Sequence, residues 1–138
     1  EENYVRRIKE KIQTLNLQEN VVLYGYVSES EKNKIIDKSH ILICPSQKEG
    51  WGLTVHEVGA RGVPAVAYNV PGLREVVVDD VNGKLVSKNT AYDLAVACIN
   101  VFNNKRDFSR LQKGAISERR KFTWNKTGEE FLKIIHEK

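Results

Sequence analysis

Long apolar runs are missing from this sequence of 138 residues. None approaches the roughly 20 residues that a membrane-spanning helix requires. Cysteine is scarce too, and Cys44 and Cys98 do not make the framework of a disulfide-rich secreted domain, although a disulfide between them stays open. Both lie in apolar patterns and are predicted to be buried thiols. The three histidines are far apart and no Cys/His spacing resembles a metal site, so no bound metal is expected.

What the sequence does contain is typical of one soluble globular domain, with 41% hydrophobic and 29% charged residues. The net charge of +4 is modest, and Lys and Arg are scattered apart from one cluster, Arg119-Arg120-Lys121. A solvated helix end explains this cluster better than nucleic acid, because no aromatic interleaving or recognised binding motif accompanies it. We expect a cytoplasmic protein without a transmembrane segment or a nucleic-acid partner, and peripheral attachment to the inner membrane face stays open.

The chain is organised around Glu49-Gly50-Trp51-Gly52-Leu53-Thr54-Val55-His56-Glu57, in which two acids bracket a glycine-rich turn. The apolar run 41–44 before it has the length and isoleucine content of a buried parallel strand. After it, apolar and glycine residues recur at helical spacing until Gly62-Val63-Pro64 ends the pattern. The stretch predicts a strand, a glycine turn and a helix, with Glu49 before the helix and Glu57 in its first turn.

This arrangement favours a ligand that carries both phosphates and hydroxyls. Free N–H groups at a helix start, beside glycines that permit close approach of the backbone, form an anion site suited to phosphate. Carboxylates would repel a phosphate, so Glu49 and Glu57 are left for neutral sugar hydroxyls. Simpler roles remain open, because Thr54-x-x-Glu57 also matches a capping box and Glu49 can be an ordinary solvated acid.

Alternating strand and helix patterns predict a doubly wound, Rossmann-like parallel α/β sheet, in which ligands bind beyond the carboxyl ends of the strands. Strands are expected at about 21–24, 41–44, 65–68 and 84–86. Besides the central helix, helices are expected at about 2–15, 28–39, 107–120 and 126–137, with one helical turn at 73–75 and a further helix capped by Asn89 or Thr90. The last helix is expected to bury Phe131, Ile134 and Ile135, with Thr127-x-x-Glu130 as its capping box.

The sequence blocks resemble the carboxyl-terminal, donor-binding domain of retaining, sugar-nucleotide-dependent glycosyltransferases of the large family 4 type, which have the two-domain GT-B fold. The resemblance covers nearly the whole chain. Its most specific run is Cys44-Pro45-Ser46, Glu49-Gly50-Trp51-Gly52-Leu53, Glu57 and Gly62-Val63-Pro64. The other blocks are Val22-Leu23-Tyr24-Gly25-Tyr26-Val27, Pro71-Gly72-Leu73-Arg74-Glu75-Val76-Val77, Asn82-Gly83-Lys84-Leu85-Val86 and Phe122-Thr123-Trp124.

The resemblance implies transfer of a sugar from a UDP- or GDP-linked donor with retention of anomeric configuration, without a cofactor or a required metal. It implies that Glu49 binds the donor sugar beside the reacting carbon and that Glu57 accepts hydrogen bonds from the ribose hydroxyls. Val27 would border the nucleobase. Backbone amides would hold the diphosphate at Gly50, Trp51, Gly52 and Leu53, together with Thr54.

The sequence departs from the family mainly in what it lacks. The first two strands of the donor domain, with the Gly-Arg-Leu and the later Lys that clamp the diphosphate, are absent, and so is the amino-terminal acceptor domain. By the family's strand order, those strands would lie between 21–24 and 41–44. Residues 1–138 are therefore expected to form a partial sugar-nucleotide-binding domain, inactive alone, with an exposed strand edge at 41–44. Gly59 replaces a larger residue and is expected to loosen the central helix.

The expected partner is the missing amino-terminal domain or another chain that completes the sheet. Two other classes of function remain open. A non-catalytic sugar-nucleotide-binding or scaffold module would keep the same turn without supporting transfer. A glycosyl phosphorylase would need a lysine positioned for pyridoxal phosphate, and the sequence shows no signature of one. The acceptor is a sugar, a lipid-linked molecule or a protein, because the contacts that select it belong to the absent domain.

Overall fold

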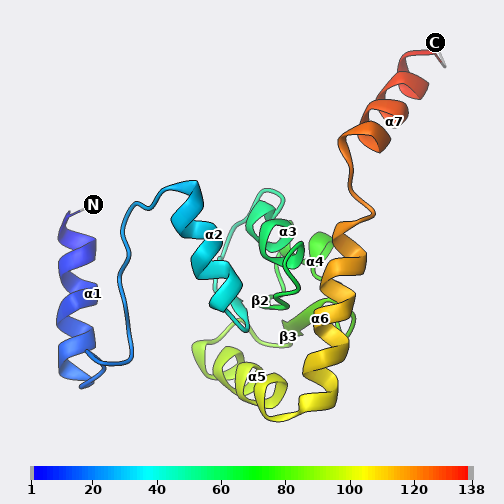
Figure 1. Cartoon of the computed structure of the whole chain (residues 1–138). Coiled ribbons are helices and arrows are strands. Elements are labelled where there is room, and N and C mark those ends of the chain that lie inside the picture. Colours follow the sequence, from blue (N-terminus) through cyan, green and yellow to red (C-terminus); the bar gives the residue numbers. More distant parts are fainter. Residues whose placement is uncertain (1, 137–138) are drawn as a thin grey trace. The chain divides into compact units, whose positions relative to one another are not determined.

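The computed structural model describes residues 2–136, which divide into two compact units at Asn33 and Lys34. In the first unit, α1 (Glu2–Thr14) forms where the apolar spacing predicts it, yet it has no buried residue (Figure 1). The helix α2 (Glu29–Lys38) runs across the boundary and begins with a capping box. The Ser28 amide donates to the Glu31 carboxylate at 2.9 Å, and the Glu31 amide donates to Ser28 Oγ at 3.3 Å.

The second unit holds a parallel three-stranded sheet, as the alternating pattern predicts. Its strands are β1 (Leu42–Cys44), β2 (Ala65–Tyr68) and β3 (Gly83–Val86), which lie side by side in that order. Ile43 pairs with Val66, and Val66 pairs with Lys84. Every residue of β2 is buried, because this strand has a neighbouring strand on each side and helices over each face.

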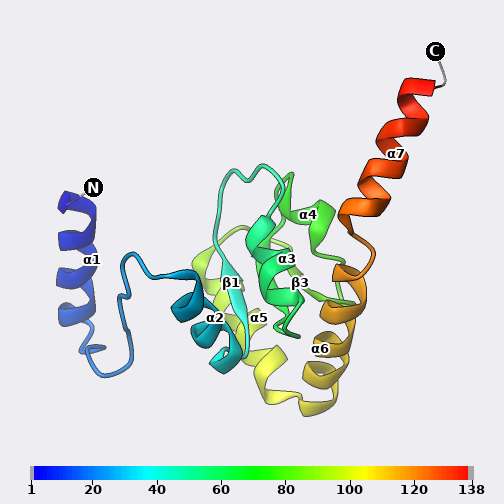
Figure 2. The same ribbon diagram turned by 45° about the horizontal axis from the view of Figure 1, so that its top comes forward.

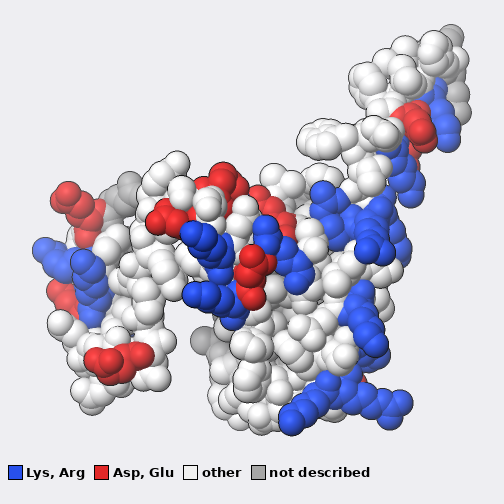
Figure 3. Space-filling view, viewed as in Figure 1, with Lys and Arg blue, Asp and Glu red and all other residues white. Residues whose placement is uncertain are grey.

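The helices of the second unit cover both faces of the sheet. α5 (Ala91–Asn103) packs on β2 and β3, and α3 (Leu53–Gly59) lies on the opposite side (Figure 2). α6 (Lys105–Arg119) contacts α3, α5 and β3, and its outer face carries many of the Lys and Arg side chains (Figure 3). The short α4 (Leu73–Val76) follows β2 and adds Leu73 and Val76 to the core.

Gly59 marks the crossing of α3 and α6. A methyl group on this buried glycine would lie 3.4 Å from the carbonyl oxygen of Ala115, in the middle of α6. This is an ordinary van der Waals distance, so α3 has room for a methyl group at this position. The expectation that Gly59 loosens the packing of the central helix stays a prediction.

Residues 21–24 do not form the predicted strand. Their side chains are exposed, with 66% of Val22 and 58% of Tyr24 accessible to solvent, and none of the strands described here pairs with them. The β-branched pattern is suitable for a strand, but a strand forms only when a neighbour supplies hydrogen bonds to its backbone. The prediction is wrong for this structure because that neighbour is not present among residues 2–136.

The edge of β1 is open, as the sequence predicts. Among the described strands β1 pairs only with β2, and the other side of its backbone faces no strand. Ile43 in the middle of β1 is 52% exposed. An apolar edge of this kind is a template for pairing with another extended segment.

The last helix, α7 (Trp124–His136), begins two residues earlier than predicted, and its cap is different. The Lys126 amide donates to Thr123 Oγ at 3.2 Å, so Thr123 is the capping residue and the predicted box at Thr127 and Glu130 is wrong. Phe131, Ile134 and Ile135 are 51% to 65% exposed, because α7 extends beyond α6 without an element over its apolar face (Figure 1). The prediction that this helix buries them is also wrong.

Within residues 2–136, no helix combines the length and the apolar character that a membrane crossing requires. The thiols of Cys44 and Cys98 are both free and only partly buried, so the prediction of two fully buried thiols is too strong.

Candidate functional site

The predicted sequence of strand, glycine turn and helix is present at the carboxyl edge of the sheet. β1 ends at Cys44 and α3 begins at Leu53, with residues 45–52 between them. Gly52 is the N-cap of α3 and has φ 60°, a left-handed conformation that favours glycine. The first helical hydrogen bond runs from the Val55 amide to the Gly52 carbonyl at 2.8 Å. The structure therefore brings the turn and the start of the helix to the edge where parallel sheets bind ligands.

Glu49 lies in this turn with an exposed side chain. One of its carboxylate oxygens accepts a hydrogen bond from the amide of the next residue, Gly50, at 3.1 Å, so the acid is bonded to the backbone of its own turn. Such a bond is easily exchanged for a ligand hydroxyl, because solvent reaches the carboxylate. Nearby, burial raises the pKa of the Cys44 thiol to about 11, and the negative charge of Glu49 adds to the effect. Cys44 is therefore a protonated thiol at neutral pH and not a nucleophile.

Glu57 and Thr54 lie on α3, and both are exposed. Because Gly52 is the N-cap, Thr54 is already inside the helix and cannot head a capping box with Glu57. That alternative for Glu57 is wrong, and the side chain lies on the helix face that solvent reaches. Gly50, Trp51 and Leu53 are exposed as well, whereas Gly52 is buried.

Val27 is the one predicted site residue that belongs to the first unit; it lies in the segment that joins α1 to α2 along the chain, and its side chain is half-buried. Its place beside a nucleobase stays a prediction. The described residues contain no group of His, Cys, Asp and Glu arranged to hold a metal ion. Whether a metal takes part stays a prediction as well.

An aromatic cluster beside the turn was not foreseen from the sequence. The Trp51 ring lies 5.1 Å from His56 and 5.9 Å from Phe122, and the His56 and Phe122 rings are 4.7 Å apart. These rings, with Leu53 and the carboxyl end of α6, line a hollow of about 570 Å³. Phe122 is far from Trp51 in the chain, so the spacing of residues within a single helix or strand does not reveal the contact.

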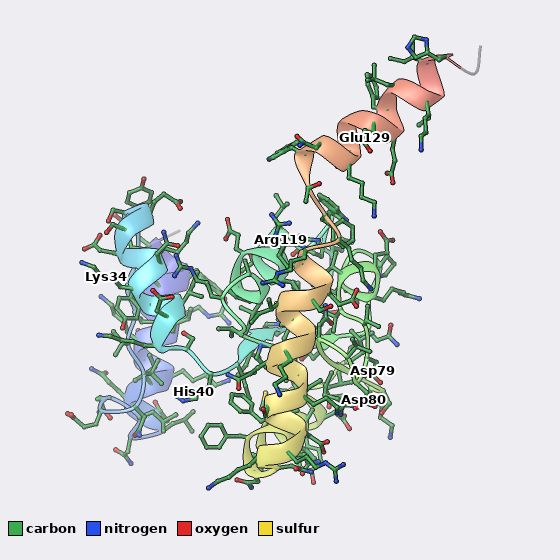
Figure 4. The ribbon with its side chains drawn as sticks, turned by 45° about the vertical axis from the view of Figure 1, so that its right-hand side comes forward. Lys34, His40, Asp79, Asp80, Arg119 and Glu129 are labelled. Atoms are coloured by element: carbon green, nitrogen blue, oxygen red, sulfur yellow. The ribbon has the colours of Figure 1, made fainter. Side chains whose placement is uncertain are left out.

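His56 is the polar member of this aromatic cluster. Burial lowers its pKa, and the nearby positive charge of Arg119 lowers it further. Its Nε2 atom is buried and has no hydrogen-bond partner among the described residues. Figure 4 shows Arg119 at the carboxyl end of α6, where the chain leaves for α7. The neutral imidazole is therefore the stable form here.

A larger hollow, about 1060 Å³, lies between β3, α5 and the first turns of α6. Part of its charged lining is paired: Lys84 contacts Asp80 at 3.0 Å, and Arg110 contacts Asp107 at 3.4 Å. Figure 4 shows Asp79 and Asp80 on that side, away from Arg119. This hollow is lined by residues 80–111 and is not part of the turn.

Comparison with known proteins places these features in a family. The family described as "Glycosyl transferases group 1" matches residues 1–120. An uncharacterized glycosyltransferase of Methanocaldococcus jannaschii is 33% identical over 77% of this chain and 30% of its own length. The D-inositol 3-phosphate glycosyltransferase of a Nocardioides species is 34% identical over 78% of this chain and 24% of its own length. The chain thus spans less than a third of these relatives.

Solved structures agree on the fold. A sucrose-phosphate synthase from Thermosynechococcus elongatus has a TM-score of 0.83 at 25% identity, over 96% of this chain and 35% of its own. HepE of Anabaena in complex with UDP has a TM-score of 0.89 at 19% identity, over 99% of this chain and 38% of its own. The chain belongs to the group 1 glycosyl transferases, with the fold of the carboxyl-terminal domain of a GT-B glycosyltransferase.

Proposed function

We propose that this chain is the donor-binding part of a glycosyltransferase that moves a sugar from a nucleotide sugar to an acceptor with retention of configuration. The observation that carries the proposal is the turn from Glu49 to Gly52 at the carboxyl edge of the sheet, where residues 49–51 are exposed and α3 follows directly with Glu57 on its surface. The family supports the reaction class.

In the proposed complex, Glu49 accepts hydrogen bonds from the donor sugar and Glu57 accepts them from the ribose. Backbone amides of residues 50–54 meet the diphosphate, where preorganised N–H groups stabilise the charge that develops on the leaving group. The bond from the anomeric carbon to the diphosphate breaks, the acceptor oxygen forms the new bond on the same face, and the diphosphate takes the acceptor's proton. Neither a cofactor nor a metal ion is required.

The donor is linked to UDP or GDP. HepE of Anabaena was solved in complex with UDP-glucose, which makes that compound a sensible first probe. We expect calorimetric titration of the protein to show binding of UDP-glucose or GDP-glucose in competition with the free diphosphate. Failure of both donors and both diphosphates to bind would overturn the proposal. Val27 is proposed to contact the base, so Val27→Asp should weaken binding of UDP or GDP as well as of the sugar conjugate.

The alternative is a non-catalytic module that binds the nucleotide sugar without transferring it. The donor contacts would be the same in both cases, so titration alone does not separate them. A transfer assay does, if the chain is supplied with the acceptor-binding domain or the polypeptide proposed to complete the open edge of β1. We propose that the reaction takes place in the cytoplasm. The acceptor domain also decides which acceptor is used and whether the enzyme attaches peripherally to the inner membrane face.

A further inference from the structure

We propose that α4 and the residues at its two ends position the turn from Glu49 to Gly52, with Gly72 and Asn82 as positioning residues. Neither residue needs to touch the donor. The inference rests on the proposed function of the turn. It adds to that function the part of the fold that fixes the position and orientation of Glu49.

The first contact is at the amino end of α4. Gly72 is the N-cap of this helix and has φ 83°. A methyl group on Gly72 would overlap the carbonyl oxygen of Glu49 and lie 2.8 Å from that of Gly50. Both atoms belong to the backbone, so they cannot give way unless the turn itself moves. The bare α-carbon of Gly72 is therefore the surface on which the peptide between Glu49 and Gly50 rests.

The second contact is on the apolar face of α4. A methyl group on Gly52 would lie 2.8 Å from Cγ2 of Val76 and 3.5 Å from Cδ2 of Leu73. Leu73 is 1% exposed and Val76 is 4% exposed, so both side chains are fixed in the core. One short helix thus packs against both ends of the turn, with Gly72 at Glu49 and Val76 at Gly52.

Asn82 holds the other end of α4. Its side chain is 6% exposed and is the only polar one in the buried core of residues 2–136. Nδ2 donates to the Val76 carbonyl at 2.8 Å, and Oδ1 accepts from the Val78 amide at 2.8 Å. These two bonds fix where the helix stops. A buried amide with both groups satisfied is stabilising, and its loss leaves two backbone groups unpaired.

These contacts matter because α4 has only four residues, Leu73 to Val76. A helix this short has no stability of its own, so its position depends on its anchors. Donor contacts require groups held to within a fraction of an ångström. A shift of α4 therefore reaches the Glu49 carboxylate and the amides of the turn without any change in the residues that meet the donor.

The experiment uses Trp51 as a reporter. The substitution Trp124→Phe leaves Trp51 as the only tryptophan, next to Gly50 in the turn. In this background Gly72→Ala, Asn82→Ala and Asn82→Asp are compared by Trp51 fluorescence without nucleotide and by calorimetric affinity for UDP-glucose, below the melting temperature. Gly62→Ala is the matched control: Gly62 has φ 76°, but its methyl group would meet the flexible end of Ile116 at 3.3 Å and the Gln112 carbonyl at 3.8 Å, both on α6, and not the turn.

We expect Gly72→Ala and Asn82→Ala to change Trp51 emission and to weaken UDP-glucose binding by about tenfold, the equivalent of one lost hydrogen bond. Asn82→Asp keeps the bond to the Val78 amide and should retain part of the affinity. Gly62→Ala should lower stability and leave both readouts unchanged. If Gly72→Ala does not fold, the two Asn82 variants decide the question.

Unchanged emission and affinity in folded Asn82→Ala would overturn the inference, and so would equal changes in Gly62→Ala. Failure of the proposed function gives a different result. If the Trp124→Phe protein with Gly72 and Asn82 intact does not bind UDP-glucose but Trp51 emission responds to the variants as expected, then α4 positions the turn and the turn serves another ligand.

Discussion

At the scale of single residues, Glu49 has the clearest expected effect. Its carboxylate is exposed, and among residues 2–136 only the adjacent Gly50 amide donates a hydrogen bond to it. We expect Glu49→Ala, in an assembly with the acceptor domain present, to lower kcat by roughly 100-fold, because a contact made in the transition state affects turnover more than ground-state affinity. Steady-state kinetics and titration with the nucleoside diphosphate measure the two effects. Glu130→Ala on α7 is the control, and near-normal turnover in Glu49→Ala would contradict the assignment.

Glu57 should behave differently, because its proposed ligand is the ribose and not the reacting sugar. We expect Glu57→Gln to weaken binding of the free nucleoside diphosphate by roughly 1–3 kcal/mol, the scale of a charge-assisted hydrogen bond. Calorimetry beside a thermal melt separates this outcome from a structural role. A lower melting temperature with unchanged affinity would show that Glu57 stabilises α3 and does not bind the nucleotide.

His56 predicts a pH dependence of folding stability. Burial and then Arg119 lower its pKa below the ordinary value of 6.5, so the unfolded chain takes up a proton more readily than the folded one. The contribution of His56 is therefore fully present above pH 6.5 and is lost as the pH falls through the lowered pKa. We expect His56→Phe, which keeps an aromatic ring in the cluster, to remove this component of acid destabilisation.

Urea unfolding at several pH values on both sides of 6.5 measures the effect of His56→Phe. His136→Phe, at the exposed end of α7, is the control because it changes the number of histidines without touching the cluster. An unchanged slope of stability against pH in His56→Phe would exclude His56 as the titrating group.

At the scale of elements, the open edge of β1 should govern self-association. We expect Ile43→Lys to reduce concentration-dependent association, because a charged residue on an edge strand disfavours pairing with another strand. Light scattering over a range of concentrations measures it, with Ile134→Lys on α7 as the comparison. If only Ile134→Lys reduces association, the apolar face of α7 is the contact and the edge of β1 is not.

The sequence predicts the elements whose partners lie within the described chain. β2 is predicted correctly because its short apolar run is buried on both faces. α5 is predicted correctly because Thr90 caps it by accepting a hydrogen bond from the Asp93 amide. The strand predicted at residues 21–24 is wrong because this segment, although it has the same apolar pattern, has no neighbouring strand to pair with. The predicted burial of the apolar face of α7 is wrong for a similar reason. An amphipathic pattern predicts that one face of a helix packs against another element, but it does not show that such an element is present.

For the candidate site, the sequence predicts the turn and both acids on the correct elements, but Glu57 lies beyond the first turn of α3 and not in it as predicted. It does not predict the contacts between segments distant in the chain. Nothing in the local pattern indicates that Phe122 packs edge-to-face against His56 or that Gly72 lies against Glu49. Such contacts depend on how α6 and α4 pack on the sheet. That packing is decided by the shapes of the side chains and not by the periodic spacing of apolar residues in the sequence.

At the scale of the whole molecule, the chain covers 24% and 30% of two relatives whose names include glycosyltransferase. We expect the 138-residue protein alone to bind a nucleotide sugar and to transfer no sugar. A radiolabelled donor, offered with and without the rest of the enzyme, measures transfer. Full transfer by a cooperative monomer of only these residues would refute this expectation.

Metal dependence is tested on the same assembly. We expect activity to survive treatment with a chelator, because backbone amides at the turn can meet the diphosphate charge. The assay compares initial rates before chelation, after it, and after addition of Mg²⁺ or Mn²⁺. A loss of activity that one of these ions restores would contradict the proposal.

The order of the sheet, β1-β2-β3, has a consequence for how this unit is made. Each strand pairs with the strand that follows it along the chain, so the only connections that must close before the sheet forms are residues 45–64 and 69–82. During synthesis β1 can pair with β2, and β2 with β3, as soon as each following strand emerges. Neither pairing requires a segment from further downstream. All strand pairings of the described sheet are available once Val86 has left the ribosome, and the helices from α5 onward then cover a sheet that is already assembled.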